Sequence, residues 1–143
     1  MNTRRAGFTL LELLVVIALM AVAMGVLGLG IGQGLQAARE RQAVRDLVVA
    51  LRQTRTHAVL SGAPALLRFD LAGRWYQAPG QARHRWPANL GVQLNVAQPW
   101  GSAFAFFPDG GSSGGHVLLS RGEQRWRIDV AWLTGGVRWR VLQ

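Results

Sequence analysis

The chain has 143 residues, which is enough for about one domain, and it carries sixteen arginines, no lysine and seven acidic residues. Its formal net charge of +9 suits a nucleic acid, an anionic lipid surface or an acidic protein partner, and equally a solvated arginine face with no polyanion partner. Because there is no cysteine, disulfides, zinc–thiolate sites and thiol nucleophiles are excluded.

The chain begins with a short basic leader, residues 1–7, followed by a long apolar segment, residues 8–34. The leader contains Arg4 and Arg5, and the apolar segment carries a single charge, Glu12. As a helix the apolar segment would be about 40 Å long, against about 30 Å of hydrocarbon in a bilayer. The arginines before it favour a cytoplasmic N-terminus, so we expect a single membrane span in the inner membrane and an exported head.

Two other interpretations of this segment are a secretory signal peptide and a plain membrane anchor. Ala21-Val22-Ala23 offers a small-x-small cleavage site for a signal peptidase. The apolar run nevertheless continues to Ile31, and Glu12 would place a costly carboxylate inside the apolar part of a signal peptide. A plain anchor leaves Glu12 unexplained.

The residues around Glu12 carry a resemblance to a known family. The run Arg5-Ala6-Gly7-Phe8-Thr9-Leu10-Leu11-Glu12-Leu13 resembles the class III signal of type IV pilins and type II secretion pseudopilins. That resemblance implies that a prepilin peptidase cuts between Gly7 and Phe8 and that the new N-terminus of Phe8 is methylated. It also makes Glu12 the fifth residue of the mature chain.

A carboxylate in lipid needs a partner, and a filament offers the freed amine of Phe8 on a neighbouring subunit. We therefore expect Glu12 to act in assembly; the alternative is a glutamate that reaches from the helix end towards the lipid headgroups. Glycines at positions 25, 28, 30, 32 and 34 crowd the distal half of the segment. Their spacing suits either close helix packing or a stretch that unwinds, and the sequence leaves both open.

Residues 35–60 are predicted to continue as an amphipathic helix. One face carries Ala37, Val44, Val48, Leu51, Ala58 and Val59 at helical spacing. The other face carries Arg39, Asp46, Gln53 and His57. The apolar stripe is predicted to pack against a sheet rather than to form a cofactor site, and Ser61-Gly62-Ala63-Pro64 is predicted to end the helix.

Residues 65–143 show the pattern of short strands. The predicted strands are 65–71, 74–77, 91–96, 103–107 and 116–120, with Ala72-Gly73 as a hairpin turn. Residues 78–89 are predicted to be a loop, 108–115 a long turn and 121–123 a short turn. A long helix followed by an antiparallel sheet is an α+β arrangement.

The last hairpin is predicted from the alternation in residues 125–134 and 137–142 around Gly135-Gly136. If the two glycines form a two-residue primed turn, Thr134 pairs with Val137. Trp132 would then face Trp139, and Val130 would face Val141. Arg127, Arg138 and Arg140 would share the opposite face.

Several C-terminal segments resemble the H-type minor pseudopilin and its FimT relatives. They are Phe107-Pro108-Asp109-Gly110-Gly111-Ser112-Ser113-Gly114-Gly115, His116-Val117-Leu118-Leu119, Trp126-Arg127-Ile128-Asp129-Val130 and Leu133-Thr134-Gly135-Gly136. The resemblance implies a pilin-like head, a structural role near the tip of the type II secretion pseudopilus, and no enzymatic activity. The implied partners are the prepilin peptidase, other minor and major pseudopilins, the inner membrane and exported cargo.

Two further patterns bear on catalysis and metal binding. Gly110-x-Ser112-x-Gly114 matches a serine hydrolase elbow, but a strand rather than a helix follows it, so no catalytic residue is assigned. The three histidines lack ligand spacing, so no metal or cofactor is expected.

The alternative function is a FimT-like minor pilin of a type IV pilus that binds DNA for uptake through its basic C-terminal hairpin. The residues for that role are Arg125, Arg127, Arg138 and Arg140. The Arg-x-Arg of the FimT-like motif is present, although Val137 separates it from the glycine.

Overall fold

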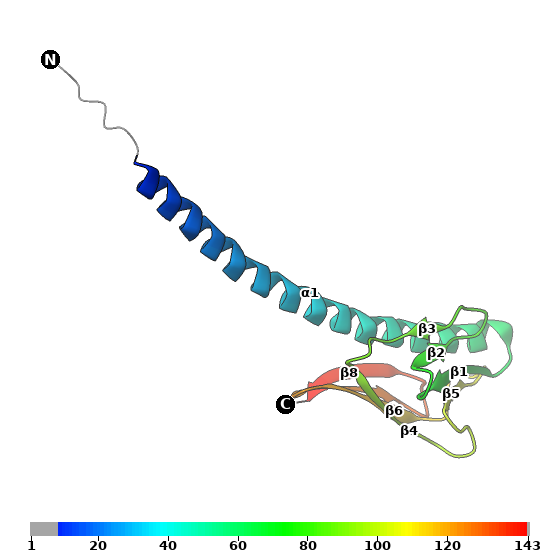
Figure 1. Cartoon of the computed structure of the whole chain (residues 1–143). Coiled ribbons are helices and arrows are strands. Elements are labelled where there is room, and N and C mark those ends of the chain that lie inside the picture. Colours follow the sequence, from blue (N-terminus) through cyan, green and yellow to red (C-terminus); the bar gives the residue numbers. More distant parts are fainter. Residues whose placement is uncertain (1–8, 143) are drawn as a thin grey trace. The chain divides into compact units, whose positions relative to one another are not determined.

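The computed structural model describes residues 9–142, and within the long helix the side chains of residues 26–34 and 36 are not described. One helix, α1 (Leu10–Ser61), precedes all the strands (Figure 1). The strands are β1 (Ala65–Asp70), β2 (Trp75–Gln77), β3 (His84–Arg85), β4 (Gly91–Val96), β5 (Ala103–Phe106), β6 (Gly115–Arg121), β7 (Gln124–Val130) and β8 (Val137–Leu142). The chain divides into two compact units, one ending at Ala38 and the head, which begins at Arg39.

The backbone of α1 is helical throughout the glycine-rich stretch and ends at Ser61. Gly62, at φ 65°, lies in the left-handed region that suits a glycine after a helix end, as the sequence predicted. Among the described residues, no helical window combines the length and the hydropathy needed to cross a bilayer. The predicted span includes Phe8 and the side chains of residues 26–34, which lie outside the described residues.

Within the head, α1 buries the face that the sequence predicted, with two differences. Val44, Val48, Leu51 and Ala58 are buried, and Leu47 and Ala50 join them. Val59, predicted to belong to this face, is 44% exposed, because it lies a further 100° around the helix from Ala58. The stripe also contains two polar side chains, Glu40 and Thr54, which are both buried. The Thr54 hydroxyl donates to the Ala50 carbonyl oxygen at 2.8 Å.

The strands form two four-stranded antiparallel sheets, where the sequence had suggested one. The first sheet has the order β3-β2-β1-β5 and the second has the order β4-β6-β7-β8. The predicted first hairpin is confirmed, since Phe69 lies opposite Tyr76 in the β1–β2 pair. The predicted loop 78–89 contains β3, which pairs with β2 because Trp86, next along the chain, is buried against Phe69 and Tyr76.

The predicted register of the last hairpin is wrong by four residues. Val130, rather than Thr134, lies opposite Val137, and Ile128 lies opposite Trp139. A type I′ turn would need positive φ at both glycines, and only Gly135 has it. The Gly135 amide donates to the Ala131 carbonyl at 2.8 Å, which draws both glycines into a longer connection. The chain instead forms a six-residue loop, residues 131–136, closed by a hydrogen bond from the Ala131 amide to the Gly136 carbonyl.

A shift of an even number of residues leaves each side chain on its predicted face. Arg127, Arg138 and Arg140 therefore do share the outer face of the second sheet. The inner faces of both sheets and the buried stripe of α1 form one apolar core, which includes Leu51, Leu67, Phe104, Phe106, Leu119 and Ile128. Among the described residues this core includes none before Ala43, so the head has its own hydrophobic core.

Candidate functional site

The N-terminal motif is described in part. Gly7 and Phe8 lie outside the described residues, while Glu12 lies in the first turn of α1 and is exposed. The amide of Glu12 donates to the hydroxyl of Thr9 at 3.2 Å, so Thr9 is the N-cap of the helix. Thr9-x-x-Glu12 has the spacing of a capping box. In the sequence these residues were assigned to the class III signal, and the cap was not identified. The carboxylate of Glu12, in the first turn, also interacts favourably with the positive end of the helix dipole.

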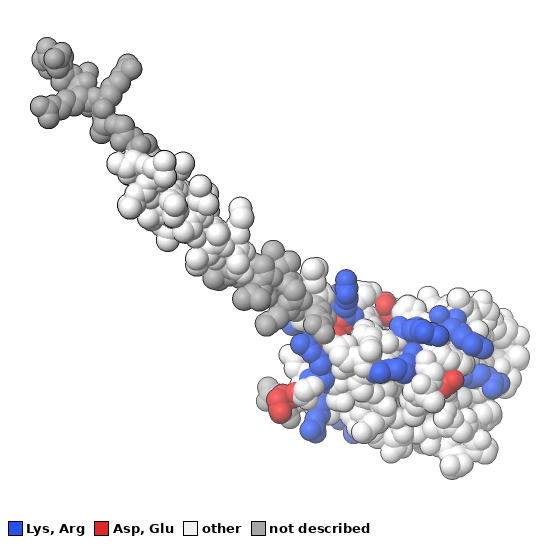
Figure 2. Space-filling view, in the orientation of Figure 1, with Lys and Arg blue, Asp and Glu red and all other residues white. Residues whose placement is uncertain are grey.

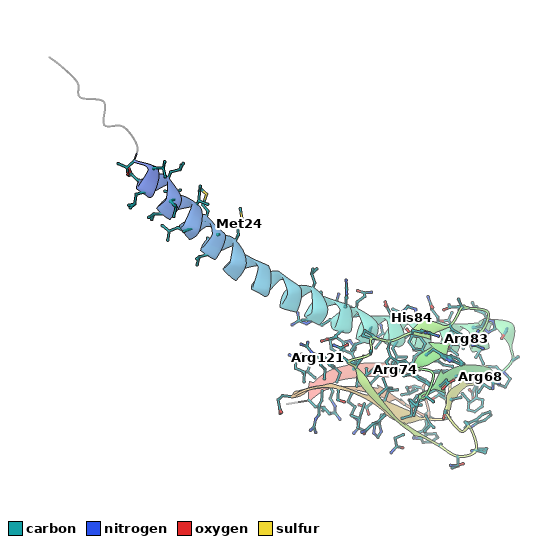
Figure 3. The ribbon with its side chains drawn as sticks, viewed as in Figure 1. Met24, Arg68, Arg74, Arg83, His84 and Arg121 are labelled. Atoms are coloured by element: carbon teal, nitrogen blue, oxygen red, sulfur yellow. The ribbon has the colours of Figure 1, made fainter. Side chains whose placement is uncertain are left out.

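A buried carboxylate fixes α1 to the second sheet. Glu40 is 1% exposed, and its Oε2 accepts a hydrogen bond of 2.5 Å from Nη1 of Arg121 at the end of β6. Its Oε1 accepts a second hydrogen bond, of 2.7 Å, from the side-chain amide of Asn89. Figure 3 shows Arg121 beside α1. One sign of this contact was present in the sequence: Glu40 lies four positions before Val44 and therefore on the apolar face of the helix.

The two glycine-rich loops pack against each other and against α1. Nε of Arg55 donates to the Gly110 carbonyl at 3.0 Å. Gly135 has φ 60°, and a Cβ there would run into the Gly110 carbonyl and come within 2.8 Å of Nε of Arg55. Only glycine fits at this position.

Ser112 fastens the same two loops together. Its hydroxyl donates to the Ala131 carbonyl at 3.0 Å and accepts from the Gly114 amide at 3.0 Å, and its amide donates to the Trp132 carbonyl at 2.8 Å. Both hydrogen-bonding capacities of the buried hydroxyl are therefore used within the fold. The serine of the elbow-like pattern is part of a loop contact and is not aimed at a substrate.

The four candidate DNA-binding arginines lie together on the outer face of the second sheet, but they do not form an uninterrupted basic surface. Asp129 lies among them: its Oδ1 is 2.6 Å from Nε of Arg127, and its Oδ2 is 3.8 Å from Nη2 of Arg140. Arg138 lies directly opposite Asp129 across the β7–β8 pair. Arg125 lies at the far end of the strand, opposite Leu142.

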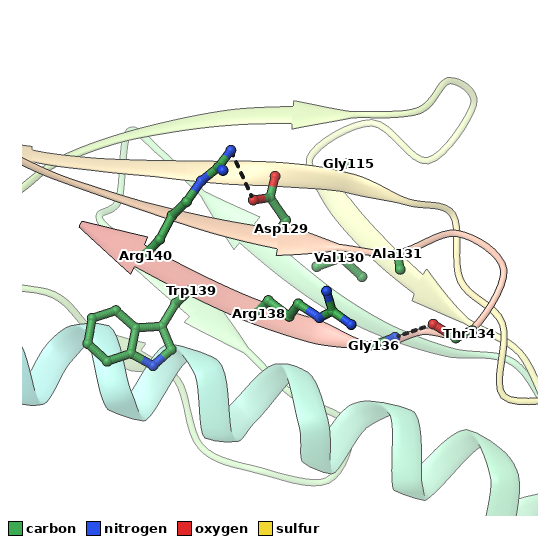
Figure 4. Close-up of a pocket in the computed structure, with 9 residues that line it drawn as sticks. All are labelled: Gly115, Asp129, Val130, Ala131, Thr134, Gly136, Arg138, Trp139 and Arg140. Atoms are coloured by element: carbon green, nitrogen blue, oxygen red, sulfur yellow. Dashed lines mark hydrogen bonds and ion pairs between the residues drawn. The ribbon is translucent and has the colours of Figure 1, made fainter. Parts of the chain in front are cut away.

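A shallow hollow of about 590 Å³ opens on this face (Figure 4). It is lined by Gly115, Asp129, Val130, Ala131, Thr134, Gly136, Arg138, Trp139 and Arg140. The hollow has one carboxylate and two arginines, so it has no strong charge of one sign. Its lining does not pair a nucleophile with a neighbouring base.

A second groove, of about 380 Å³, lies between α1 and the edge of the second sheet. It is lined by Arg41, Val44 and Arg45 from α1, by Gln124 and Trp126 from β7, and by Trp139 and Val141 from β8. Trp139 and Val141 are on the helix-facing side of β8, yet they are 47% and 57% exposed. From the sequence, Trp139 was paired with Trp132, and its exposure was therefore not predicted.

The first sheet holds an aromatic cluster of Phe69, Tyr76, Trp86 and Phe104. Burial raises the pKa of Tyr76 well above its usual range, and the nearby carboxylate of Asp46 raises it further. Asp46 also lies 3.6 Å from Nε2 of His84. Across the described residues, no three histidine and acidic side chains are grouped as a metal site would require.

Comparisons with known proteins agree with this anatomy. Residues 2–28 match the family model of the prokaryotic N-terminal methylation motif, and residues 43–135 match that of the type II transport protein GspH. The chain is 39% identical over 137 residues to the type II secretion system protein H of Xanthomonas campestris pv. campestris, covering 92% of this chain and 81% of that protein.

A solved structure shares the fold. The minor pseudopilin EpsH from the type 2 secretion system of Vibrio cholerae superposes with a TM-score of 0.56. The match covers 73% of this chain and 96% of EpsH, at 13% sequence identity. At that identity, the likeness establishes the pilin-like α+β fold.

Proposed function

The chain belongs to the GspH family of type II transport proteins, and on that premise we propose that it is a minor pseudopilin. In this role it is a structural subunit near the tip of the periplasmic pseudopilus that the type II secretion system uses in protein export. The observation that carries the proposal is the joint presence, in one chain, of the N-terminal methylation motif and the GspH head.

The N-terminal motif gives the proposal its assembly step. A prepilin peptidase cuts after Gly7, Phe8 becomes the methylated N-terminus, and residues 8–34 hold the subunit in the inner membrane until the filament extracts it. The carboxylate of Glu12 pairs with the amine of Phe8 on a neighbouring subunit, because that pairing neutralises two charges in an apolar surrounding. The Thr9 cap supports this role by starting the helix at the motif, which fixes where the Glu12 side chain emerges.

The head contributes surfaces rather than chemistry. Two of its buried polar side chains, Ser112 and Glu40, are used in contacts that join its loops, its second sheet and its part of α1. A head held together in this way suits a subunit that presents fixed surfaces to other pseudopilins and to exported cargo.

The proposal is tested by deleting the gene in its own bacterium and restoring it as wild type, Glu12→Val or the matched control Leu13→Val. We expect the deletion and Glu12→Val to leave type II substrates in the periplasm, while the wild type and Leu13→Val restore export. The membrane content of each variant is measured alongside, and Glu12→Val is expected to accumulate there normally. Intact secretion in the deletion strain, together with loss of DNA uptake, would overturn the proposal.

A further inference from the structure

The C-terminal strand β8 is an open edge of the second sheet. It pairs with β7 on one side only. Nη2 of Arg52 donates to the Val137 carbonyl at 3.3 Å, which occupies the start of the strand. From Arg138 to Leu142, no hydrogen bond from the described part of the chain reaches the backbone on the side away from β7. An unpaired edge of this kind is a template for a further strand.

The other sheet edges offer less. The β5 edge is covered, because the Ser113 amide donates to the Ala105 carbonyl at 2.8 Å and the Ala105 amide donates to the Ser113 hydroxyl at 3.1 Å. β3 has two residues, and β4 places its apolar side chains against the core. Only β8 combines an open backbone with large apolar side chains, Trp139 and Val141, that stay half-exposed over a groove.

The positive charge around this edge is concentrated on the helix side, while Asp129 offsets part of it on the outer face. Arg41 and Arg45 border the groove on the helix side, and Arg138 and Arg140 flank β8 on the outer face. Within the part of the chain that the structure describes, no carboxylate lies within 4 Å of Arg41, Arg45 or Arg138. Like charges four residues apart on a helix are destabilising, so Arg41 and Arg45 carry a cost that an external anion would relieve. Figure 2 shows more arginine than carboxylate surface on the visible face of the head, with carboxylates lying among the arginines.

We propose that the β8 edge binds an extended, acidic segment of a different protein by strand addition. The segment would pair its backbone with β8, place an apolar side chain against Trp139 and Val141, and direct carboxylates towards Arg41, Arg45 and Arg138. Main-chain pairing supplies affinity in this binding mode, and the side-chain positions supply specificity. That the partner is a neighbouring filament subunit rests on the proposed function. That the head binds an acidic strand at the β8 edge does not depend on it.

Two other occupants fit less well. A second copy of this chain lacks the required segment, because no two of its seven acidic residues lie closer than six positions apart. Its head, with fourteen arginines against six carboxylates, would also repel a copy of itself. A nucleic acid would satisfy the arginines but would leave the backbone edge of β8 unpaired, and Asp129 would oppose it on the outer face.

The test uses the full chain purified in detergent micelles and a dye-labelled peptide of glutamates with valine at every fourth position. In an extended strand, one face of this peptide alternates valine with glutamate, to meet Trp139, Val141, Arg41 and Arg45, and the other face carries glutamate only, to meet Arg138. About ten residues are enough to cover the six residues of β8. Fluorescence anisotropy is measured at about 0.15 M salt, where distant charges are screened. We expect the acidic peptide to bind at least about ten-fold more tightly than its glutamine counterpart. A copy N-methylated at every backbone nitrogen should not bind, because it has no amide proton to donate to β8 from either edge.

Matched variants locate the site. Arg41→Gln with Arg45→Gln, and separately Trp139→Ser, should each weaken binding about ten-fold. Arg68→Gln with Arg85→Gln removes the same charge from the first sheet, and Trp132→Ser removes another exposed tryptophan; both should bind as the wild type does. Equal binding by all variants, binding by the N-methylated peptide, or displacement by single-stranded DNA at equal concentration would overturn the proposal. Because secretion is assayed separately, a failure of peptide binding leaves the proposed function standing.

Discussion

Glu40 is predicted to be the most sensitive polar position of the head. Among the described residues of α1 it is the first that is fully buried, and it joins the helix to the end of β6 and to the loop before β4. Glu40→Ala removes both hydrogen bonds and leaves a small cavity. Glu40→Gln keeps the size of the side chain and removes the charge that attracts Arg121.

The magnitude follows from what happens to the two partners. Breaking a fully buried ion pair costs about 3–5 kcal/mol, because the remaining charge is stranded. The Arg121 side chain is 34% exposed and Asn89 is exposed, so both can turn to water. We therefore expect about 3 kcal/mol of destabilisation for Glu40→Ala, for two hydrogen bonds to a charged group and the cavity. For Glu40→Gln we expect about 1.5 kcal/mol.

Urea unfolding of a soluble fragment beginning at Leu35, followed by tryptophan fluorescence, measures these differences. For a head of this size, each 1 kcal/mol also lowers the melting temperature by about 4–8 °C. A double-mutant cycle with Arg121→Ala should give a coupling energy of about 1–2 kcal/mol between the two side chains. Glu123→Gln, at the exposed β6–β7 turn, is the control and should change stability by less than about 0.5 kcal/mol. The reasoning is refuted if Glu40→Gln matches that control or if the two alanine changes are additive.

Three further predictions concern processing, the loop contact and pH. Mass spectrometry of the mature protein should find a methylated N-terminus at Phe8; a chain beginning at Met24 would instead indicate a signal peptide. Gly135→Ala should destabilise the head by about 2–4 kcal/mol, since it adds a clash with the Gly110 carbonyl to the strain of positive φ. Gly122→Ala, at φ 51° in open space, should cost only about 1 kcal/mol, and equal effects on urea unfolding would disprove the clash. Folding raises the pKa of Tyr76. The contribution of this neutral tyrosine to the free energy of unfolding is therefore fully present below about pH 10 and is lost as the pH rises above that value. Tyr76→Phe should flatten this loss of stability, and an ultraviolet titration of this single tyrosine that shows ordinary ionisation in the folded head would contradict it.

The elements with strong local signals could be predicted from the sequence. The apolar spacing around Val44 and Leu51 and the Ser61-Gly62 stop placed the helix and its buried face. The alternation in residues 125–134 and 137–142 placed the arginines on one face of their hairpin. These signals are local, since each depends on spacing within a single element and on turn residues next to it.

The parts that could not be predicted depend on residues distant in the sequence. The register of the last hairpin follows from Ser112, which holds the backbone of residues 131 and 132 in a loop and so keeps them out of a strand. Glu40 is separated from Arg121 by 81 positions, and the residues around Glu40 do not indicate which side chain it pairs with. The division into two sheets likewise follows from long-range pairing, because β4 bypasses β5 to pair with β6.

The arginines show why net charge alone was a poor guide to function. Arg121, Arg127, Arg55 and Arg52 have acceptors within the fold, and the guanidinium of Arg74 donates to the carbonyls of the loop before β4. Arg83 lies 4.4 Å above the ring of Trp75. Arg121 and Arg127 face carboxylates that offset their charge, and the others are held in place by carbonyls or by a ring, so these side chains are less free to reach a partner.

The arginines that keep their charge available are therefore the ones that matter for binding, and their positions decide between partners. On the outer face, Asp129 is shared by Arg127 and Arg140, so a phosphate backbone laid across that face would meet a carboxylate at its centre. At the β8 edge, by contrast, Arg41 and Arg45 stand beside an exposed tryptophan and an unpaired backbone. A polyanion would use only the charge there, whereas an acidic strand would use the charge, the apolar groove and the backbone together. The net charge of +9 suited a nucleic acid, a lipid surface or an acidic protein alike, and the arginines at the β8 edge are better matched to the protein.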